Sequence, residues 1–166
     1  MRTPTRPALV ALTVALSPVV ADLHLAAQTP DEHAAVLAVA EEALEAVTRE
    51  DWASFAALLL PEGMTFSARA DENGPRYSAR TREYYRELID PEDIVERGFD
   101  ARVLVSGPVA LVWMPYDLYV EGAWSHCGVD TFTMILTGDG WRIAGMAWTV
   151  EQPPACTAHP DGPPGG

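Results

Sequence analysis

Hydrophobic residues recur at helical spacing in two segments that follow one another early in the chain. Over residues 30–48 they repeat every three or four positions, which predicts an amphipathic helix with Thr29 as its capping residue. A second apolar stripe over residues 52–60 follows Asp51, which is suited to cap a helix, and the Pro61-Glu62-Gly63 sequence should end it. The pattern therefore predicts two consecutive helices before any strand.

After these helices the pattern changes to short β-rich runs. A strand is expected at 64–68 and an exposed loop at 71–75, followed by a third helix from Ser78 to about Leu88. Four more strands are expected at 99–105, 109–120, 124–137 and 141–151. The short glycine-containing connections between these four favour an antiparallel meander. The order predicts an α+β fold with helices on one face of a curved, mainly antiparallel sheet.

The first 27 residues have the pattern of a signal peptide. Arg2 and Arg6 precede an apolar run at 8–20, and Ala27 offers a cleavage site, with Ala21 as an alternative. The other interpretation is an uncleaved anchor, but the run is shorter than the roughly 20 apolar residues that a membrane span needs. We therefore expect an exported protein, periplasmic or secreted.

The chain then divides into three parts, with boundaries at 1–27 for the signal peptide, 28–151 for one folded domain and 152–166 for a tail. The tail is rich in Pro and Gly, so we expect it to be disordered past Cys156. A length of 166 residues suits a single domain with a substantial core.

The strongly negative net charge of the chain disfavours some classes of binding partner. The formal net charge of −13 disfavours nucleic acid, which needs clustered basic residues, and also disfavours docking to anionic lipid. We expect no membrane contact after cleavage and a small molecule as the ligand. In an oxidising compartment Cys127 and Cys156 would form a disulfide, although one buried thiol and one free tail thiol is the alternative.

Two-residue turns at Glu121-Gly122 and Gly138-Asp139 would fix the strand register. They place Tyr119 opposite Trp124, Asp117 opposite His126, and His126 opposite Glu151, with Cys127 on the other face. A carboxylate beside an imidazole raises its basicity, as a general base or a polar-ligand anchor requires. The same pair can also serve only to satisfy buried polar groups. The candidate catalytic residues are Asp117 and His126, and the candidate ligand-binding residues are Trp113, Tyr119, His126, Asp130 and Glu151.

The remaining histidines offer no metal site. His24, His33 and His159 show no ligand-like spacing, so we expect neither a metal nor a cofactor. Tyr84, Tyr85 and Arg69 are candidates for a pocket mouth, although core packing and a solvated surface are the simpler interpretations.

Several short segments, taken in this order, resemble the nuclear transport factor 2-like, or SnoaL-like, superfamily. The segments are Glu50-Asp51-Trp52-Ala53-Ser54-Phe55-Ala56-Ala57-Leu58-Leu59, Val109-Ala110-Leu111-Val112-Trp113-Met114-Pro115-Tyr116, Ser125-His126-Cys127-Gly128-Val129-Asp130 and Gly140-Trp141-Arg142-Ile143. The resemblance covers about residues 30–151. It implies a conical half-barrel with a pocket between the helices and the concave sheet, and a homodimer formed through the sheet.

The resemblance does not imply one activity, because its members include isomerases, polyketide cyclases, dehydratases and transport adaptors. The isomerase machinery does not carry over, since 30–48 contains no tyrosine and 64–68 no carboxylate. We expect an exported protein that binds a small molecule. One alternative is a cofactor-independent isomerase, dehydratase or hydrolase-like enzyme with an Asp/His acid–base pair. The other is a dimeric interaction module with a vestigial pocket.

Overall fold

The computed structural model describes residues 30–89 and 93–165, so the predicted signal peptide lies outside the described residues. Three helices are present there: α1 (Pro30–Thr48), α2 (Trp52–Leu58) and α3 (Arg82–Glu87). The strands are β1 (Leu59–Asp71), β2 (Gly74–Thr81), β3 (Ile94–Gly98), β4 (Arg102–Ser106), β5 (Val109–Val120), β6 (Ala123–Thr137) and β7 (Gly140–Thr149). None of these helices is long and apolar enough to cross a membrane.

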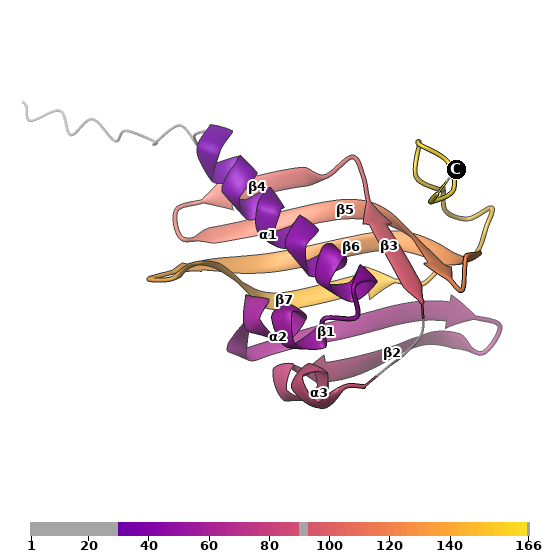
Figure 1. Ribbon diagram of the computed structural model, residues 1–166, viewed down its shortest axis with the longest axis horizontal. Helices are drawn as coiled ribbons and strands as arrows, with labels where there is room; N and C mark the ends of the chain where they lie inside the picture. The colour runs from indigo at the N-terminus through magenta and orange to yellow at the C-terminus, as the bar shows by residue number, and fades with distance from the viewer. Residues whose placement is uncertain (1–29, 90–92, 166) are drawn as a thin grey trace, which may run out of the picture.

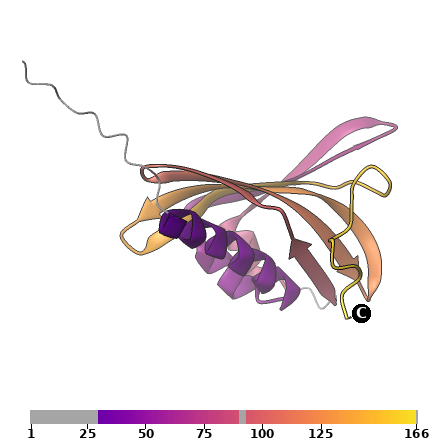
Figure 2. The same ribbon diagram turned by 90° about the horizontal axis from the view of Figure 1, so that it is seen from above.

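The strands form one seven-stranded sheet in the order β2-β1-β7-β6-β5-β3, and β4 also pairs with β5. The β1–β7 pair is parallel and the other pairs are antiparallel. The helices lie together on one side of the sheet (Figure 1), and the sheet curves around them (Figure 2). The predicted α+β fold, with helices on a curved and mainly antiparallel sheet, is confirmed. We call the helix side of the sheet the concave face and the opposite side the outer face.

The core lies between α1 and the concave face. The helical pattern predicted over 30–48 holds, and Val36, Ala40 and Ala43 are fully buried there. Gly98 in β3 lies close to both α1 and β5, since a Cβ atom there would be 2.5 Å from Met114 Sδ and 2.9 Å from Leu44 Cδ1. The missing side chain lets the end of β3 run under the helix.

Two predicted helix boundaries are wrong. Leu59 and Leu60 belong to β1 rather than to α2, because Leu59 pairs with Ile143 and is buried in the core. Ser78 does not start a helix. It pairs with Ser67 in the β1–β2 hairpin, and Thr81 caps α3 instead. Hairpin pairing over residues 74–81 thus replaces the first turns of the expected helix, and β3 was not predicted.

The predicted register holds near the turns and fails beyond them. Tyr119 lies opposite Trp124, and Thr137 lies opposite Gly140, as expected. A β-bulge then leaves Ser125 without a partner, so Leu118 lies opposite His126 and Asp117 lies opposite Cys127. A second bulge between β6 and β7 brings Glu151 opposite Cys127 rather than His126. Each extra residue moves the pairing by one position.

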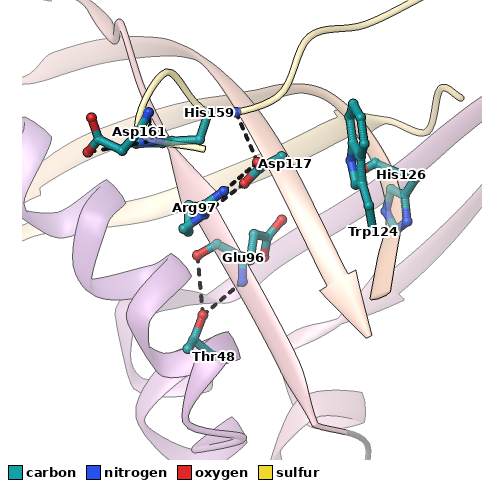
Figure 3. A network of polar contacts seen from close by, with 8 residues as sticks. All are labelled: Thr48, Glu96, Arg97, Asp117, Trp124, His126, His159 and Asp161. Atoms are coloured by element: carbon teal, nitrogen blue, oxygen red, sulfur yellow. Dashed lines mark hydrogen bonds and ion pairs between the residues drawn. The ribbon is translucent and has the colours of Figure 1, made fainter. Parts of the chain in front are cut away.

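The predicted disulfide between Cys127 and Cys156 is present, with the two Cα atoms 5.8 Å apart. The expected disorder past Cys156 is wrong. The backbone N–H of His159 donates to Asp117 Oδ2 at 2.9 Å, and the His159 ring packs edge-on against Phe99. Figure 3 shows this segment lying over Asp117, so the tail is held by a covalent bond and by polar contacts.

The outer face carries an apolar patch over β4 and β5. Its exposed members are Leu104, Val109, Leu111 and Trp113, the last with 53% of its surface exposed. An exposed patch of this kind is common where proteins associate. The homodimer that the sequence led us to expect stays a prediction.

Loss of the disulfide should reduce stability substantially. The bond joins residues separated by 29 positions, and in the chain-entropy model a loop of this length contributes roughly 3.6 kcal/mol. Replacing Cys156 by Ser should therefore lower the free energy of unfolding by about that amount in urea denaturation. Thr157→Ser is the control, because it introduces serine at the next position of the tail and leaves both cysteines in place. Equal stability of Cys156→Ser and the wild type would contradict the structural role of the bond.

Candidate functional site

A cavity of about 220 Å³ lies between the concave face and helices α2 and α3. Most of its wall is apolar and aromatic, and three polar side chains reach it from different strands: Arg80 from β2, Glu96 from β3 and His126 from β6. We call this cavity the concave pocket. Its other lining residues are Val47, Trp52, Phe55, Tyr84, Tyr85, Leu88, Leu118, Met146 and Trp148.

The aromatic wall is built by α2 and α3. Trp52 stacks on Tyr85 with ring centroids 6.0 Å apart, and Phe55 meets Tyr85 edge-on at 4.7 Å. The Tyr85 hydroxyl lies 2.6 Å from Thr65 Oγ1 in β1, which fixes the ring against the sheet. Burial raises the pKa of Tyr85, opposed by its hydrogen bond with Thr65 and by the nearby Arg80 guanidinium. Tyr85 is therefore an uncharged wall residue at neutral pH.

Glu96 occupies the wall on the β3 side. Its backbone N–H donates to Thr48 Oγ1 at 2.9 Å, and Thr48 Oγ1 in turn donates to the Glu96 carbonyl at 3.2 Å. This pair ties β3 to the last residue of α1, and the carboxyl group points away from Thr48 (Figure 3). Burial raises the pKa of Glu96 to about 8. The carboxyl group is thus mainly protonated at neutral pH.

Asp130 lies on the same face of the sheet, between Met114 of β5 and Trp148 of β7. It is completely buried, and neither carboxyl oxygen has a hydrogen-bond partner among the described residues. Burial raises the pKa of Asp130 well above its usual range, and the charge of Glu96 raises it further. A carboxylate here would have no compensating donor, so the neutral acid is the form that this environment favours.

His126 completes the polar part of the pocket. Burial lowers the pKa of its imidazole, and the positive charge of Arg69 lowers it further. Its Nδ1 lies 3.0 Å from Ser125 Oγ, and its ring meets the Tyr116 ring edge-on at 5.9 Å. The pocket therefore holds a neutral imidazole beside neutral acid groups.

The structure separates the residues that the sequence placed together. His126 lines the pocket, and Asp130 lies on the same face close by. The Asp117–His126 pair is wrong, because the bulge at Ser125 puts His126 on the concave face, whereas Asp117 lies on the outer face opposite Cys127. There Arg97 donates to both Asp117 oxygens, at 3.0 Å from Nε and 2.6 Å from Nη2 (Figure 3).

The other predicted ligand-binding residues also lie outside the pocket. Trp113 is exposed on the outer face, and Tyr119 lies on that face against Trp124 and beneath the Arg97 guanidinium. Glu151 lies opposite Cys127 and accepts a hydrogen bond from Thr149 Oγ1 at 3.0 Å. A regular alternation without bulges would put these residues on the face of His126, and the two bulges put them elsewhere.

Glu96, Arg80 and Trp148 were missed as pocket residues. Glu96 lies in a five-residue strand that is too short to be recognised from periodicity. Arg80 was missed because a helix was predicted from Ser78 onward. In the structure Arg80 lies in the β1–β2 hairpin opposite Thr65, and this pairing directs its side chain to the concave face. The sequence did indicate this part of the site through Tyr84 and Tyr85, which were candidates for a pocket mouth and which line the cavity.

The His, Cys, Asp and Glu side chains of the described ranges form no group of three that could hold a metal ion. No protein-family model matches the sequence, and no curated protein matches it. Solved structures do match the fold.

Three of these structures illustrate the match. One is a nuclear transport factor 2-like protein from Streptomyces avermitilis to which a dehydratase activity is ascribed. Its sequence is 19% identical, the match covers 74% of this chain and 98% of that protein's chain, and the TM-score is 0.56. A protein of unknown function with a cystatin-like fold from Nostoc punctiforme is 10% identical, with 75% and 96% covered and a TM-score of 0.60. A β subunit ascribed to an aromatic-ring-hydroxylating dioxygenase from Novosphingobium aromaticivorans is 10% identical, with 72% and 89% covered and a TM-score of 0.61. The chain therefore has the nuclear transport factor 2-like, or cystatin-like, fold.

The buried acids should make stability fall as pH rises. The folded-state pKa of Glu96 is about 8 against an ordinary value of 4.5, so its contribution is fully present below pH about 4.5 and is lost as pH rises through about 8. Between these pH values the folded state holds one more proton on Glu96 than the unfolded state does, so the free energy of unfolding falls by up to about 1.4 kcal/mol per pH unit. Urea denaturation of Glu96→Gln between these pH values should show a shallower decline than the wild type.

Glu83→Gln is the control, because the Glu83 side chain is 63% exposed on α3. It should keep the wild-type pH dependence. A Glu96→Gln profile parallel to that of the wild type would show that Glu96 titrates normally in the folded protein.

Proposed function

We propose, from the nuclear transport factor 2-like fold and the geometry of the concave pocket, that this protein binds a small and largely apolar molecule. The observation that carries the proposal is a cavity with aromatic walls and a few convergent polar groups, which is the usual composition of a ligand site. Trp52, Tyr85 and Trp148 supply flat apolar surface for the body of such a molecule.

The volume of the cavity limits the size of the ligand. At about 220 Å³ it is larger than the engineered cavity of roughly 150 Å³ that holds benzene. It is smaller than most sites for drug-sized ligands, which begin at about 300 Å³. A molecule with one substituted ring, or an aliphatic body of similar size, fits these bounds.

The polar groups of the pocket are suited to a carbonyl or hydroxyl group on the ligand. A protonated Glu96 carboxyl can donate one hydrogen bond and accept others, and a neutral His126 imidazole offers one donor and one acceptor. Both groups are half-buried in a largely apolar wall, where such hydrogen bonds are stronger than in water. The pocket thus supports oriented binding of a polar group on the ligand.

A second candidate function is cofactor-independent acid–base catalysis in the same pocket. The observation that favours it is the raised pKa of Glu96, about 8, which lies close to neutral pH, where general acids and bases work best. Glu96 would take the acid–base role that the sequence assigned to Asp117, with His126 as its partner across the pocket. The dehydratase activity ascribed to the Streptomyces avermitilis protein belongs to that protein and serves here only as a precedent for the fold.

We also propose that the chain is exported. Support comes from the basic and apolar pattern of residues 1–27 and from the Cys127–Cys156 bond, since disulfides persist in oxidising compartments.

A ligand retained from the native host should be visible by native mass spectrometry. Leu118→Trp would fill the pocket, whereas Leu111→Trp places the same bulk on the exposed outer face of the same strand. We expect a bound mass on the wild type and on Leu111→Trp, and its loss from Leu118→Trp. Retention by a folded Leu118→Trp protein would reject the pocket as the binding site.

The same experiment separates binding from catalysis. Released ligand that is returned to the protein should be recovered unchanged if the protein only binds it. Conversion that is lost in Glu96→Gln would instead support the enzyme. If the wild-type protein carries no bound mass and does not bind small aromatic molecules, the result would favour the alternative of a dimeric interaction module with a vestigial pocket.

Export predicts a shortened mature chain. In a bacterium that expresses the full sequence, protein recovered outside the cytoplasm should lack residues 1–27 and should hold the disulfide, as intact mass and thiol counting would show. Leu12→Arg places a charge in the apolar run and should keep the protein inside the cell with residues 1–27 still attached. Wild-type protein found only in the cytoplasm with residues 1–27 intact would overturn the proposal.

A further inference from the structure

Arg80 stands on the wall of the concave pocket without an acidic partner. It lies opposite Thr65 in the β1–β2 hairpin, and its guanidinium carbon is 5.3 Å from the centre of the Tyr84 ring. No described Asp or Glu forms an ion pair with it, whereas Arg76, Arg86 and Arg97 all have one. The guanidinium is half-buried, lies over the Tyr84 ring and forms a hydrogen bond with the Tyr85 side chain, and its remaining donors are available to a ligand.

Arg80 determines the net charge of the side chains that line the pocket. Glu96 is mainly protonated at neutral pH because it is buried, and His126 is neutral because its pKa is lowered. Of the Glu, His and Arg side chains that line the cavity, only Arg80 then carries a charge. The pocket is therefore locally positive inside a protein whose net charge is −13.

We propose that the ligand of the concave pocket carries a carboxylate group and that Arg80 binds this group. This inference rests on the proposed function, since it names the chemical class of the molecule that the pocket holds. The planar guanidinium can meet the two carboxylate oxygens side by side, and the apolar body then lies against Trp52, Tyr85 and Trp148. A protonated Glu96 can donate to the same group.

A cationic ligand is disfavoured by the same groups. An ammonium would be repelled by Arg80 and would find neutral acids where it needs carboxylates. A neutral ligand would leave the charge of Arg80 unpaired. Phenylacetate, phenylacetamide and phenethylamine have one ring each and differ in charge, so together they test the three possibilities.

The test is an NMR titration of the disulfide-bonded mature chain with each probe near neutral pH, following the indole signals of Trp52 and Trp148. We expect phenylacetate to bind at least about tenfold more tightly than phenylacetamide, as a charge-assisted hydrogen bond provides, and phenethylamine to bind weakest. Equal affinities for the acid and the amide, or tightest binding of the amine, would overturn the inference while leaving the pocket as a binding site. Absence of binding by all three probes would count against the proposed function as well.

Variants assign the preference to Arg80. Arg80→Gln should remove the preference for phenylacetate without weakening phenylacetamide, and Arg80→Lys should retain part of it. Arg86→Gln is the matched control, because it removes the same charge from a 57% exposed side chain on α3 outside the concave pocket. A preference that survives in Arg80→Gln, or that is lost in Arg86→Gln, would contradict the assignment.

Discussion

A single extra residue in β6 places His126 on the concave face of the sheet. On the turn side of Ser125, Tyr119 and Trp124 lie together on the outer face. On the other side, His126 and Asp130 face inward. Because side chains alternate along a strand, one unpaired residue is enough to exchange the two faces. The place of His126 in the pocket and its separation from Asp117 follow from this offset.

The bulge divides the polar chemistry of the sheet between two environments. On the outer face, Asp117 is a buried carboxylate held by the Arg97 guanidinium and by the backbone of the tail. On the concave face, Asp130 has no such partner among the described residues, and protonation is what removes its charge. Burying a polar group without a hydrogen bond reduces the stability of the folded protein. Such unpaired buried acids beside a cavity are typical of functional sites.

Much of the fold could be predicted from the sequence, since α1, β5 and β6 are long and have strong periodic patterns. The site could be predicted only in part. His126 was predicted as a pocket residue and lines the cavity, and Asp130 of the same long strand lies on the same face, but the partner assigned to His126 was wrong. Neither bulge has a glycine or proline at its extra residue to mark it in the sequence. Glu96 was missed because β3 is too short for periodicity to show.

The acids of the concave face are neutral in the folded protein at neutral pH. This protonation state can be tested by measuring the ¹³C chemical shifts of the side-chain carboxyl groups as a function of pH, with Asp130→Asn and Glu96→Gln used to assign the two signals. We predict that both signals remain those of protonated carboxyl groups near neutral pH, while the signals of exposed acids such as Glu83 titrate in the ordinary acidic range. Titration of Asp130 and Glu96 together with the exposed acids would show instead that both carboxyl groups are ionised in the folded protein at neutral pH.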